Sequence, residues 1–204
     1  MDISAISNAA VAVTTLASLF ISLWVFFTQV KHARESLSAS ILREYEQQFF
    51  YSPPFLAARV ATCHFLRAQI EKGLTCSAVR QIQDADGMLP DAAWQVIDFL
   101  DSLATAANRG TVDADMAFSK FFYFYHRYWV QLEGYLAHSR FRKLDGDVDY
   151  YVDLEIFYKE LIRHGTKSRG LKLSDYTKQQ VDDFFDYEVA MNSNASSELA
   201  VRTG

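Results

Sequence analysis

The chain has 204 residues, of which 50% are hydrophobic and 22% are charged, and its formal net charge is −5 at pH 7. This composition excludes a disordered or collagen-like chain and permits one domain with a sizeable core. The low numbers of glycine and proline, 8 and 3, disfavour a turn-rich all-β fold and favour long helices. The negative charge argues against nucleic acid as a partner. Two cysteines are too few for a disulfide scaffold.

Residues 9–27 form an apolar run in which four hydroxyl groups are the only polar side-chain groups. As a helix rising about 1.5 Å per residue, this run reaches across the roughly 30 Å of hydrocarbon in a bilayer. A buried helix of a soluble protein and a cleaved signal peptide are the alternatives. A signal peptide needs basic residues before its apolar run, whereas here only Asp2 precedes the run and the basic residues follow it. We therefore predict a single uncleaved transmembrane anchor.

The charges that flank the apolar run predict its orientation. Lys31, His32 and Arg34 follow the run directly, and the positive-inside rule places such a cluster on the cytoplasmic side. The sequence thus predicts a single-pass protein of the inner (plasma) membrane, with its N-terminus outside and its C-terminal domain in the cytoplasm. Membrane lipid is a predicted partner, because Lys31, Arg34 and Arg43 can meet anionic head groups at the membrane surface.

Small residues recur at every fourth position of the apolar run, at Ala10, Thr14, Ser18 and Ser22. A stripe of small residues lets a second helix approach closely within a membrane. Chance is the alternative explanation, because small residues are common in membrane helices. The functional interpretation is a packing face for a partner membrane protein or for a second copy of this chain.

The helical pattern does not stop where the apolar run ends. Apolar positions recur at i+4 spacing through residues 31–50, so one helix is predicted from the membrane to about residue 50. Pro53 and Pro54 must end it, because proline lacks the amide donor and clashes with the preceding turn. A second helix is predicted to end near Gly73. Residues 75–87 are short and polar, which predicts one helical turn and a loop.

Two longer helices are predicted next by their start and stop signals. The third helix begins at Pro90 and ends at Gly110, and the fourth begins after an Asp113 cap and runs to about His138. Its predicted core stripe comprises Phe118, Phe121, Phe122, Tyr125, Trp129, Leu132 and Leu136. So many aromatic residues indicate a central helix that is covered on several sides.

The last predicted helices are less sharply bounded. A fifth helix carries Tyr151 and ends near Gly165, and a sixth begins at a cap formed by Ser174 or Asp175. The fold class is therefore all-α, with a single N-terminal transmembrane helix that continues into a cytoplasmic bundle of about five to six helices. The predicted domain organisation is an anchor over residues 1–30, the bundle over 31–190 and a flexible polar tail over 191–204.

No catalytic, cofactor-binding or metal-binding residue is predicted. The acidic residues 145–149 resemble the start of a calcium loop, but the glycine and glutamate that such a loop needs are absent at the required spacing. Asp98 and Asp101 share one face of the third helix. An acid–base or metal role for this pair needs a histidine or another carboxylate nearby in space, and the alternative is a polar helix face.

A second group of basic residues lies between two acidic stretches near the C-terminal end of the chain. The group comprises Lys159, Arg163, Lys167, Arg169 and Lys172. Pairing with the flanking acidic residues on a solvated surface is one interpretation. A docking patch for an acidic partner protein or for the membrane is the other.

Residues 99–113, 118–129 and 151–155 together show a distinct pattern. A helix ends in a glycine turn, the next helix begins at an aspartate and carries Tyr128 and Trp129 near its end, and a further helix carries Tyr151. This pattern resembles an uncharacterised family of small bacterial membrane-anchored proteins, described as a domain of unknown function. The resemblance implies a membrane-tethered helical domain, and it supplies no activity and no catalytic residues.

Three functional hypotheses follow. The first is a non-enzymatic single-pass membrane protein whose helical domain binds other proteins, as accessory subunit or adaptor of a membrane complex. The second is a membrane-anchored sensor or effector in stress or phage defence, which self-assembles or binds a small ligand in an aromatic pocket around Tyr125, Tyr128 and Trp129. The third is a hydrolase or metal enzyme that uses Asp98, Asp101 and a histidine.

Overall fold

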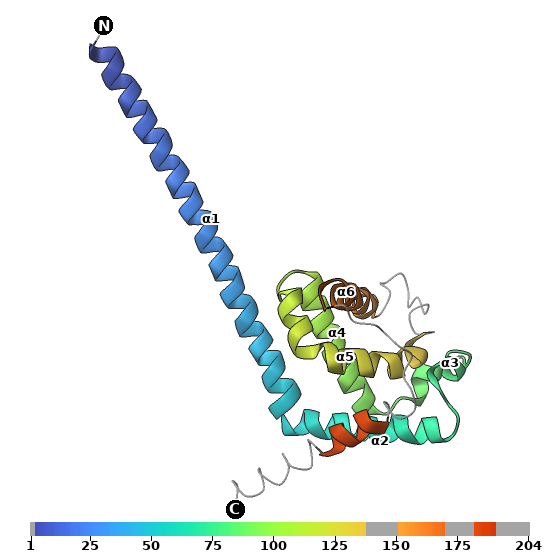
Figure 1. Cartoon of the computed structure of the whole chain (residues 1–204). Helices are drawn as coiled ribbons and strands as arrows, with labels where there is room; N and C mark the ends of the chain where they lie inside the picture. The colour runs from blue at the N-terminus through green and yellow to red at the C-terminus, as the bar shows by residue number, and fades with distance from the viewer. Residues whose placement is uncertain (1–2, 138–150, 170–181, 191–204) are drawn as a thin grey trace, which may run out of the picture.

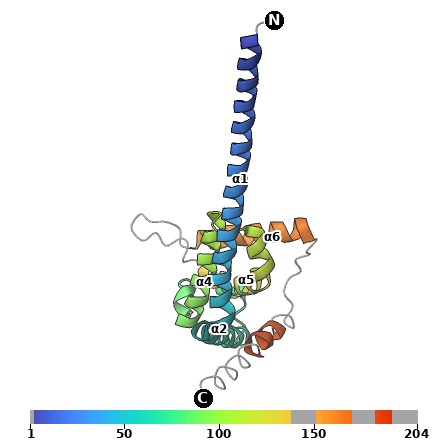
Figure 2. The same cartoon turned by 90° about the vertical axis from the view of Figure 1, so that its left-hand side faces the viewer.

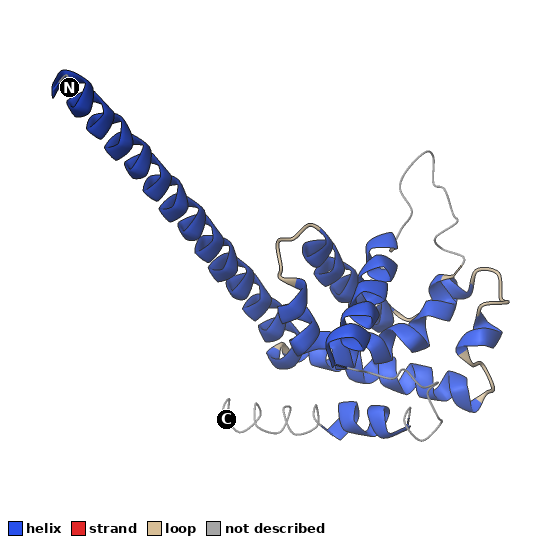
Figure 3. Ribbon diagram, turned by 45° about the horizontal axis from the view of Figure 1, so that its top comes forward, coloured by secondary structure: helices blue, strands red, loops and turns tan. Residues whose placement is uncertain are grey.

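The computed structural model of the chain describes residues 3–137, 151–169 and 182–190. Within these ranges the fold is all-α, without a strand, as predicted (Figures 1 and 3). A long N-terminal helix projects from one side of a compact group of shorter helices (Figure 1).

The long helix, α1, runs unbroken from Ile3–Tyr51 and contains 49 residues. Its N-terminal half stands apart from the bundle in both views (Figures 1 and 2). Large apolar side chains such as Phe20 and Trp24 are 74% and 65% exposed there. By its length and its composition, α1 can cross a membrane.

The chain turns sharply between α1 and α2 (Pro53–Glu71), as the two prolines predict. Ser52 has an extended backbone, and Pro53 occupies the first turn of α2, where its missing amide hydrogen costs nothing. The predicted helical turn and loop follow as α3 (Cys76–Val79) and the short 3₁₀ helix η1 (Ala85–Met88).

The central pair of helices is α4 (Asp91–Asn108) and α5 (Ala114–Leu136). Gly110 takes a φ of +69° in the turn between them, a conformation that glycine adopts without strain. The Asp113 carboxylate then accepts a 2.9 Å hydrogen bond from the backbone N–H of Met116, so the predicted cap of α5 is confirmed. Within the predicted core stripe, Phe122 is only partly buried, whereas Phe124 and Tyr128 are buried instead.

The helix α6 (Val152–Arg169) lies across the end of the bundle towards which the free half of α1 projects (Figure 2). The predicted end of this helix near Gly165 is wrong, because the helix continues to Arg169. Gly165 is buried, and packing against the bundle there outweighs the low helix propensity of glycine. Residues 182–190 form a further helical segment. Its predicted start at Ser174 or Asp175 and the predicted tail lie outside the described residues.

Polar and aromatic contacts hold the C-terminal end of α1 to the bundle. The Tyr45 hydroxyl lies 2.9 Å from the Ser102 hydroxyl of α4, and the Lys120 ammonium of α5 lies 2.8 Å from Glu46. Phe49 is fully buried, and its ring centroid lies 5.0 Å from that of Phe124. These contacts make the last part of α1 a member of the bundle.

Candidate functional site: a buried polar cluster at the end of α1

The polar cluster lies at the end of α1, where the backbone carbonyl of Phe49 lacks the amide donor that a continuing helix would supply. In a continuous helix the carbonyl of Phe49 would accept a hydrogen bond from the amide of residue 53. Residue 53 is a proline and has no amide hydrogen. Arg59, one and a half turns into α2, supplies the donor: its Nη1 lies 2.7 Å from the Phe49 carbonyl oxygen. Pro53, which prevents α1 from continuing, therefore leaves the Phe49 carbonyl to be bound by Arg59.

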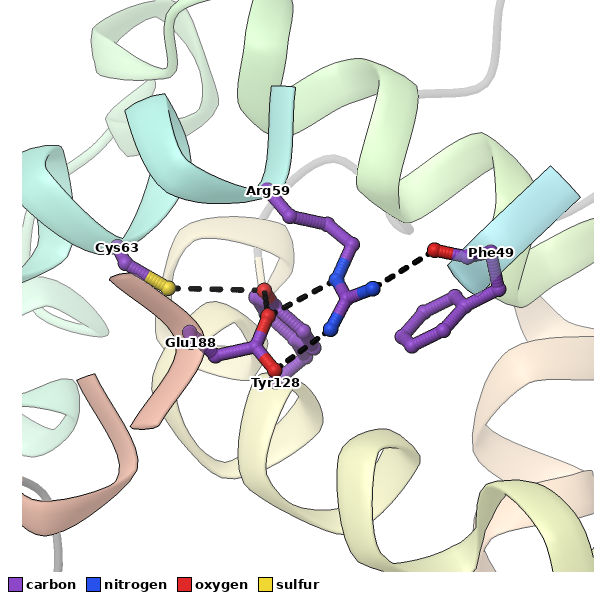
Figure 4. Close-up of polar contacts among 5 residues, drawn as sticks. All are labelled: Phe49, Arg59, Cys63, Tyr128 and Glu188. Atoms are coloured by element: carbon purple, nitrogen blue, oxygen red, sulfur yellow. Dashed lines mark hydrogen bonds and ion pairs between the residues drawn. The ribbon is translucent and has the colours of Figure 1, made fainter. Parts of the chain in front are cut away.

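The remaining donors of Arg59 bind a carboxylate from the far end of the chain (Figure 4). Nε donates to Oε2 of Glu188 at 2.9 Å, and Nη2 donates to Oε1 at 2.6 Å. The Tyr128 hydroxyl of α5 donates to the same Oε2 at 2.7 Å. The Arg59 and Glu188 side chains are 2% and 0% exposed. Such a bidentate pair, with its lone pairs further satisfied by a hydroxyl, is the geometry that buried charges require.

Aromatic rings enclose the charged groups. The guanidinium carbon of Arg59 lies 3.9 Å from the ring centroid of Phe49 and 5.2 Å from that of Phe124. A guanidinium over an aromatic face gains cation–π attraction, which is stronger when water is excluded. The cluster therefore joins the end of α1, α2, α5 and the segment 182–190 in one buried contact.

Three side chains of this cluster, Arg59, Cys63 and Tyr128, have a pKa above the ordinary value. Burial lowers the pKa of Arg59, but Tyr128 and Glu188 outweigh it and hold the pKa above its ordinary value. Burial raises the pKa of the Cys63 thiol to about 12 and the pKa of Tyr128 well above its ordinary value. The Cys63 sulfur, 3.5 Å from the Tyr128 hydroxyl, is therefore a thiol and a poor nucleophile. The geometry suits a fixed connection between four segments.

Of the acidic residues considered for an acid–base or metal role, Asp101 faces Asp153 of α6, whereas Asp98 is exposed on α4. Burial raises the pKa of Asp98, and burial together with the charges of Asp153 and Asp98 raises the pKa of Asp101. Asp153 itself accepts hydrogen bonds from Thr105 and Asn108. Among the described residues, no group of three or more histidine, cysteine or acidic side chains is arranged to hold a metal ion.

The aromatic residues considered for a ligand pocket are buried in the bundle. Tyr125 and Tyr128 are fully buried, and Trp129 is nearly so. The Tyr125 hydroxyl donates to the carbonyl of Leu154 at 2.9 Å, which joins α5 to α6. Tyr128 belongs to the polar cluster. The structure thus places these three side chains in the core.

The predicted packing stripe lies on the free half of α1. Thr14, Ser18 and Ser22 are exposed, and Ser22 donates to the Ser18 carbonyl at 2.8 Å. The side chain of Ala10 lies outside the described residues. The structure does bring the three described members to one helix face, because they are spaced four residues apart.

The two predicted basic groups lie on different elements. Lys31, Arg34 and Arg43 are exposed along α1. On α6, Lys159, Arg163 and Lys167 are exposed. Two of these pair within the helix, Lys159 with Glu155 at 2.7 Å and Arg163 with Glu160. The side chains of Arg169 and Lys172 lie outside the described residues.

The sequence analysis did not predict a site at Arg59 or Glu188, although each is a charged residue on an apolar helix face. Arg59 lies on the same helix face as Leu56, Cys63 and Leu66, so it is a charge within an apolar stripe. Glu188 lies four residues after the buried Phe184 and therefore on the same apolar face of its helical segment. Charged residues are rarely buried without a partner, and two such positions in one chain indicate a pair.

Residues 12–161 match the family model DUF4760, a domain of unknown function. The chain belongs to this family, as its resemblance predicted. Arg59, Cys63 and Tyr128 lie within the matched residues, whereas Glu188 lies beyond them. No curated protein and no solved structure matches the chain.

Proposed function

We propose that this DUF4760 member is a non-enzymatic single-pass membrane protein whose helical domain binds another protein, as an accessory subunit or adaptor of a membrane complex. The observation that best supports this proposal is the continuity of α1, which passes without a break from its exposed apolar half into the bundle. There Arg59 binds the backbone carbonyl of Phe49 in the last turn of α1. A domain attached in this way keeps its surfaces at a set height and angle to the bilayer, which suits an adaptor.

The proposed topology places the N-terminus outside and the helical domain in the cytoplasm, at the inner (plasma) membrane. The positive charges beside the apolar segment support it, because Lys31, His32 and Arg34 all follow the segment.

Two surfaces are offered for the partner protein. One is the exposed face of Thr14, Ser18 and Ser22, which suits a neighbouring membrane helix. The other is the exposed basic face of α6, where Lys167 lies beside an open hollow of about 520 Å³. This face suits an acidic segment of a partner.

The test is extraction of the tagged full-length protein from its native membrane in mild detergent, followed by native-size measurement and mass spectrometry. We expect a discrete assembly with fixed partners. Ser18→Leu blocks the small-residue face and should release a membrane partner. Ala17→Leu, which adds the same bulk one residue away on another face, is the matched control and should not.

The basic face is tested in the same experiment. Lys167→Glu should release an acidic partner, whereas Lys72→Glu, a charge reversal at an exposed position beyond the end of α2, should retain it. A species that contains only this chain would contradict the adaptor. That result would instead favour the self-assembling sensor or effector, and Ser18→Leu would then reduce its size to that of one chain.

A further inference from the structure

A groove separates the middle of α1 from the turn between α4 and α5. Its volume is about 860 Å³, which is within the range of small-molecule sites. One wall consists of α1 residues on a single face, and the other contains Gly110, Val112 and Met116. The Ser38 hydroxyl accepts a 2.6 Å hydrogen bond from the Asp113 backbone N–H, so the two walls are connected at the inner end of the groove.

The α1 wall changes from apolar to basic along the helix. Phe27 and Val30 line the groove at the end nearer the apolar run, and they are 65% and 41% exposed. Lys31 and Arg34 follow on the same face, and Ser38 closes the series. At about 1.5 Å per residue, the distance from Phe27 to Arg34 is roughly 10 Å along the helix axis. A phospholipid shows the same order, from acyl chain to phosphate.

Arg34 is the cation best placed for a ligand. Its Nη2 lies 3.6 Å from the position that a Cβ on Gly110 would occupy, so the guanidinium lies across the groove against the opposite wall. Within the ranges that the structure describes, Arg34 has no ion pair and no hydrogen-bonded side-chain partner, and it is exposed. A guanidinium binds phosphate oxygens in a bidentate manner.

In the part of the chain that the structure describes, neither acidic residue of the groove lining, Glu35 or Asp113, pairs with Arg34. The Glu35 carboxylate lies 3.9 Å from the Lys31 ammonium and 3.4 Å from His32. The Asp113 carboxylate accepts the capping hydrogen bond of α5. The exposed guanidinium of Arg34 can thus approach an anion from outside the chain.

We propose that this groove binds one anionic phospholipid of the membrane that α1 crosses, with its phosphate at Arg34 and an acyl chain along Phe27 and Val30. This inference rests on the membrane-spanning part of the proposed function. The lipid would fill the gap between the long helix and the bundle at the membrane surface, and would fix the angle between them.

The test uses the full-length protein, purified in mild detergent and depleted of lipid. Phosphatidylglycerol or phosphatidylcholine with identical acyl chains is added at equal mole fraction, and native mass spectrometry counts the lipids retained. The wild type should retain one phosphatidylglycerol in preference to phosphatidylcholine, by about fivefold or more if Arg34 contributes as a basic group at a lipid surface does.

Arg34→Gln should abolish this preference. Lys72→Gln removes one positive charge from an exposed position beyond the end of α2 and outside the groove, and it should leave the preference unchanged. Val30→Trp fills the apolar part of the groove and should reduce the retention of both lipids. Equal retention of the two lipids by the wild type, or an Arg34→Gln variant that behaves like the wild type, would overturn the inference and leave the groove to a partner or to water.

Fractionation before extraction separates this result from failure of the proposed function. If the chain does not sediment with membranes, the membrane-spanning proposal is wrong. If it sediments with membranes but shows no preference for the anionic lipid, only the lipid inference is wrong.

Discussion

Among the side chains of the cluster, Arg59 is the one that donates a hydrogen bond to the Phe49 carbonyl. The Phe49 carbonyl belongs to the backbone, and Pro53 removes its usual donor. An arginine carries five N–H donors in a planar fork, so it can bind this carbonyl and both oxygens of Glu188 at once. A hydrophobic replacement of a buried ion pair is often neutral, but here it would leave the carbonyl without a partner.

Removal of Glu188 tests the cluster at the scale of one residue. Glu188→Ala leaves the buried guanidinium of Arg59 without its counter-charge, which should lower the free energy of unfolding by about 3–5 kcal/mol. Asp186→Ala is the matched control, because this carboxylate lies two residues away and its ion pair with Arg67 is exposed. The control should cost less than about 1 kcal/mol. Urea unfolding of the full chain in mild detergent, followed by circular dichroism, measures both.

Equal losses of stability in the two variants would contradict the buried pair. An unchanged Glu188→Ala variant would mean that the segment 182–190 does not pack on the bundle as described.

His126 gives stability a pH dependence of predictable sign. Burial, assisted by the charge of Arg127, lowers the pKa of His126 to about 4 in the folded chain, whereas an unfolded histidine has a pKa of about 6.5. The unfolded state therefore binds more protons between these values, and the stability present above about pH 6.5 is lost as the pH falls towards about 4. Solvent around the half-buried ring keeps the slope below about 1.4 kcal/mol per pH unit.

The His126→Gln variant isolates this effect. The unfolding free energy of the wild type minus that of the variant should fall as the pH falls from about 6.5 to about 4. Only the wild type loses stability through this histidine, because all other titrating groups are shared. Urea unfolding at a series of pH values measures the difference. A constant difference across the window would show that the histidine does not titrate in this range.

At the scale of the elements, the sequence predicts the helices whose ends carry strong local signals. Pro53, Gly110 and Asp113 end or begin helices where expected, because each acts through its own backbone or its nearest neighbours. Gly165 misled the prediction, since its burial depends on packing that local sequence does not encode.

The candidate site shows the same limit. Arg59 and Glu188 are 129 residues apart, so a stripe pattern can flag each as a charge on an apolar face but cannot join them. The groove beside Arg34 is also invisible in sequence, because its second wall comes from the α4–α5 turn. Contacts between elements distant in the chain decide both features.

The contact between α3 and α5 depends on the absence of one side chain. A Cβ on Gly134 would lie 2.5 Å from the Cys76 carbonyl oxygen. Gly134→Ala should gain up to about 1 kcal/mol of helix propensity but lose about 1–3 kcal/mol to overpacking, so we expect net destabilisation. Gly87→Ala, where a Cβ would meet nothing within 4 Å, is the control and should be close to neutral. Thermal unfolding of the full chain compares them, and a stabilised Gly134→Ala variant would contradict the close approach.

For the whole molecule, the main feature is the attachment of the bundle to one long helix. The C-terminal part of α1 is bound to the bundle through Ser38, Tyr45, Glu46 and Phe49. Its apolar N-terminal half projects away from the bundle (Figure 2). The α4–α5 turn with its groove and the basic helix α6 both lie at the end of the bundle on the side of that projection. On the proposed topology this end faces the cytoplasmic surface of the membrane.

The proposed topology is tested most directly by finding the side of the membrane on which each half of the chain lies. Ser4→Cys and Thr166→Cys variants are treated in intact cells with a membrane-impermeant maleimide, and the wild type, with Cys63 buried and Cys76 half-buried, measures the background. We expect labelling of the Ser4→Cys variant in intact cells and labelling of the Thr166→Cys variant only after the membrane is permeabilised. Labelling of the Thr166→Cys variant in intact cells, or recovery of the chain in the soluble fraction, would contradict it.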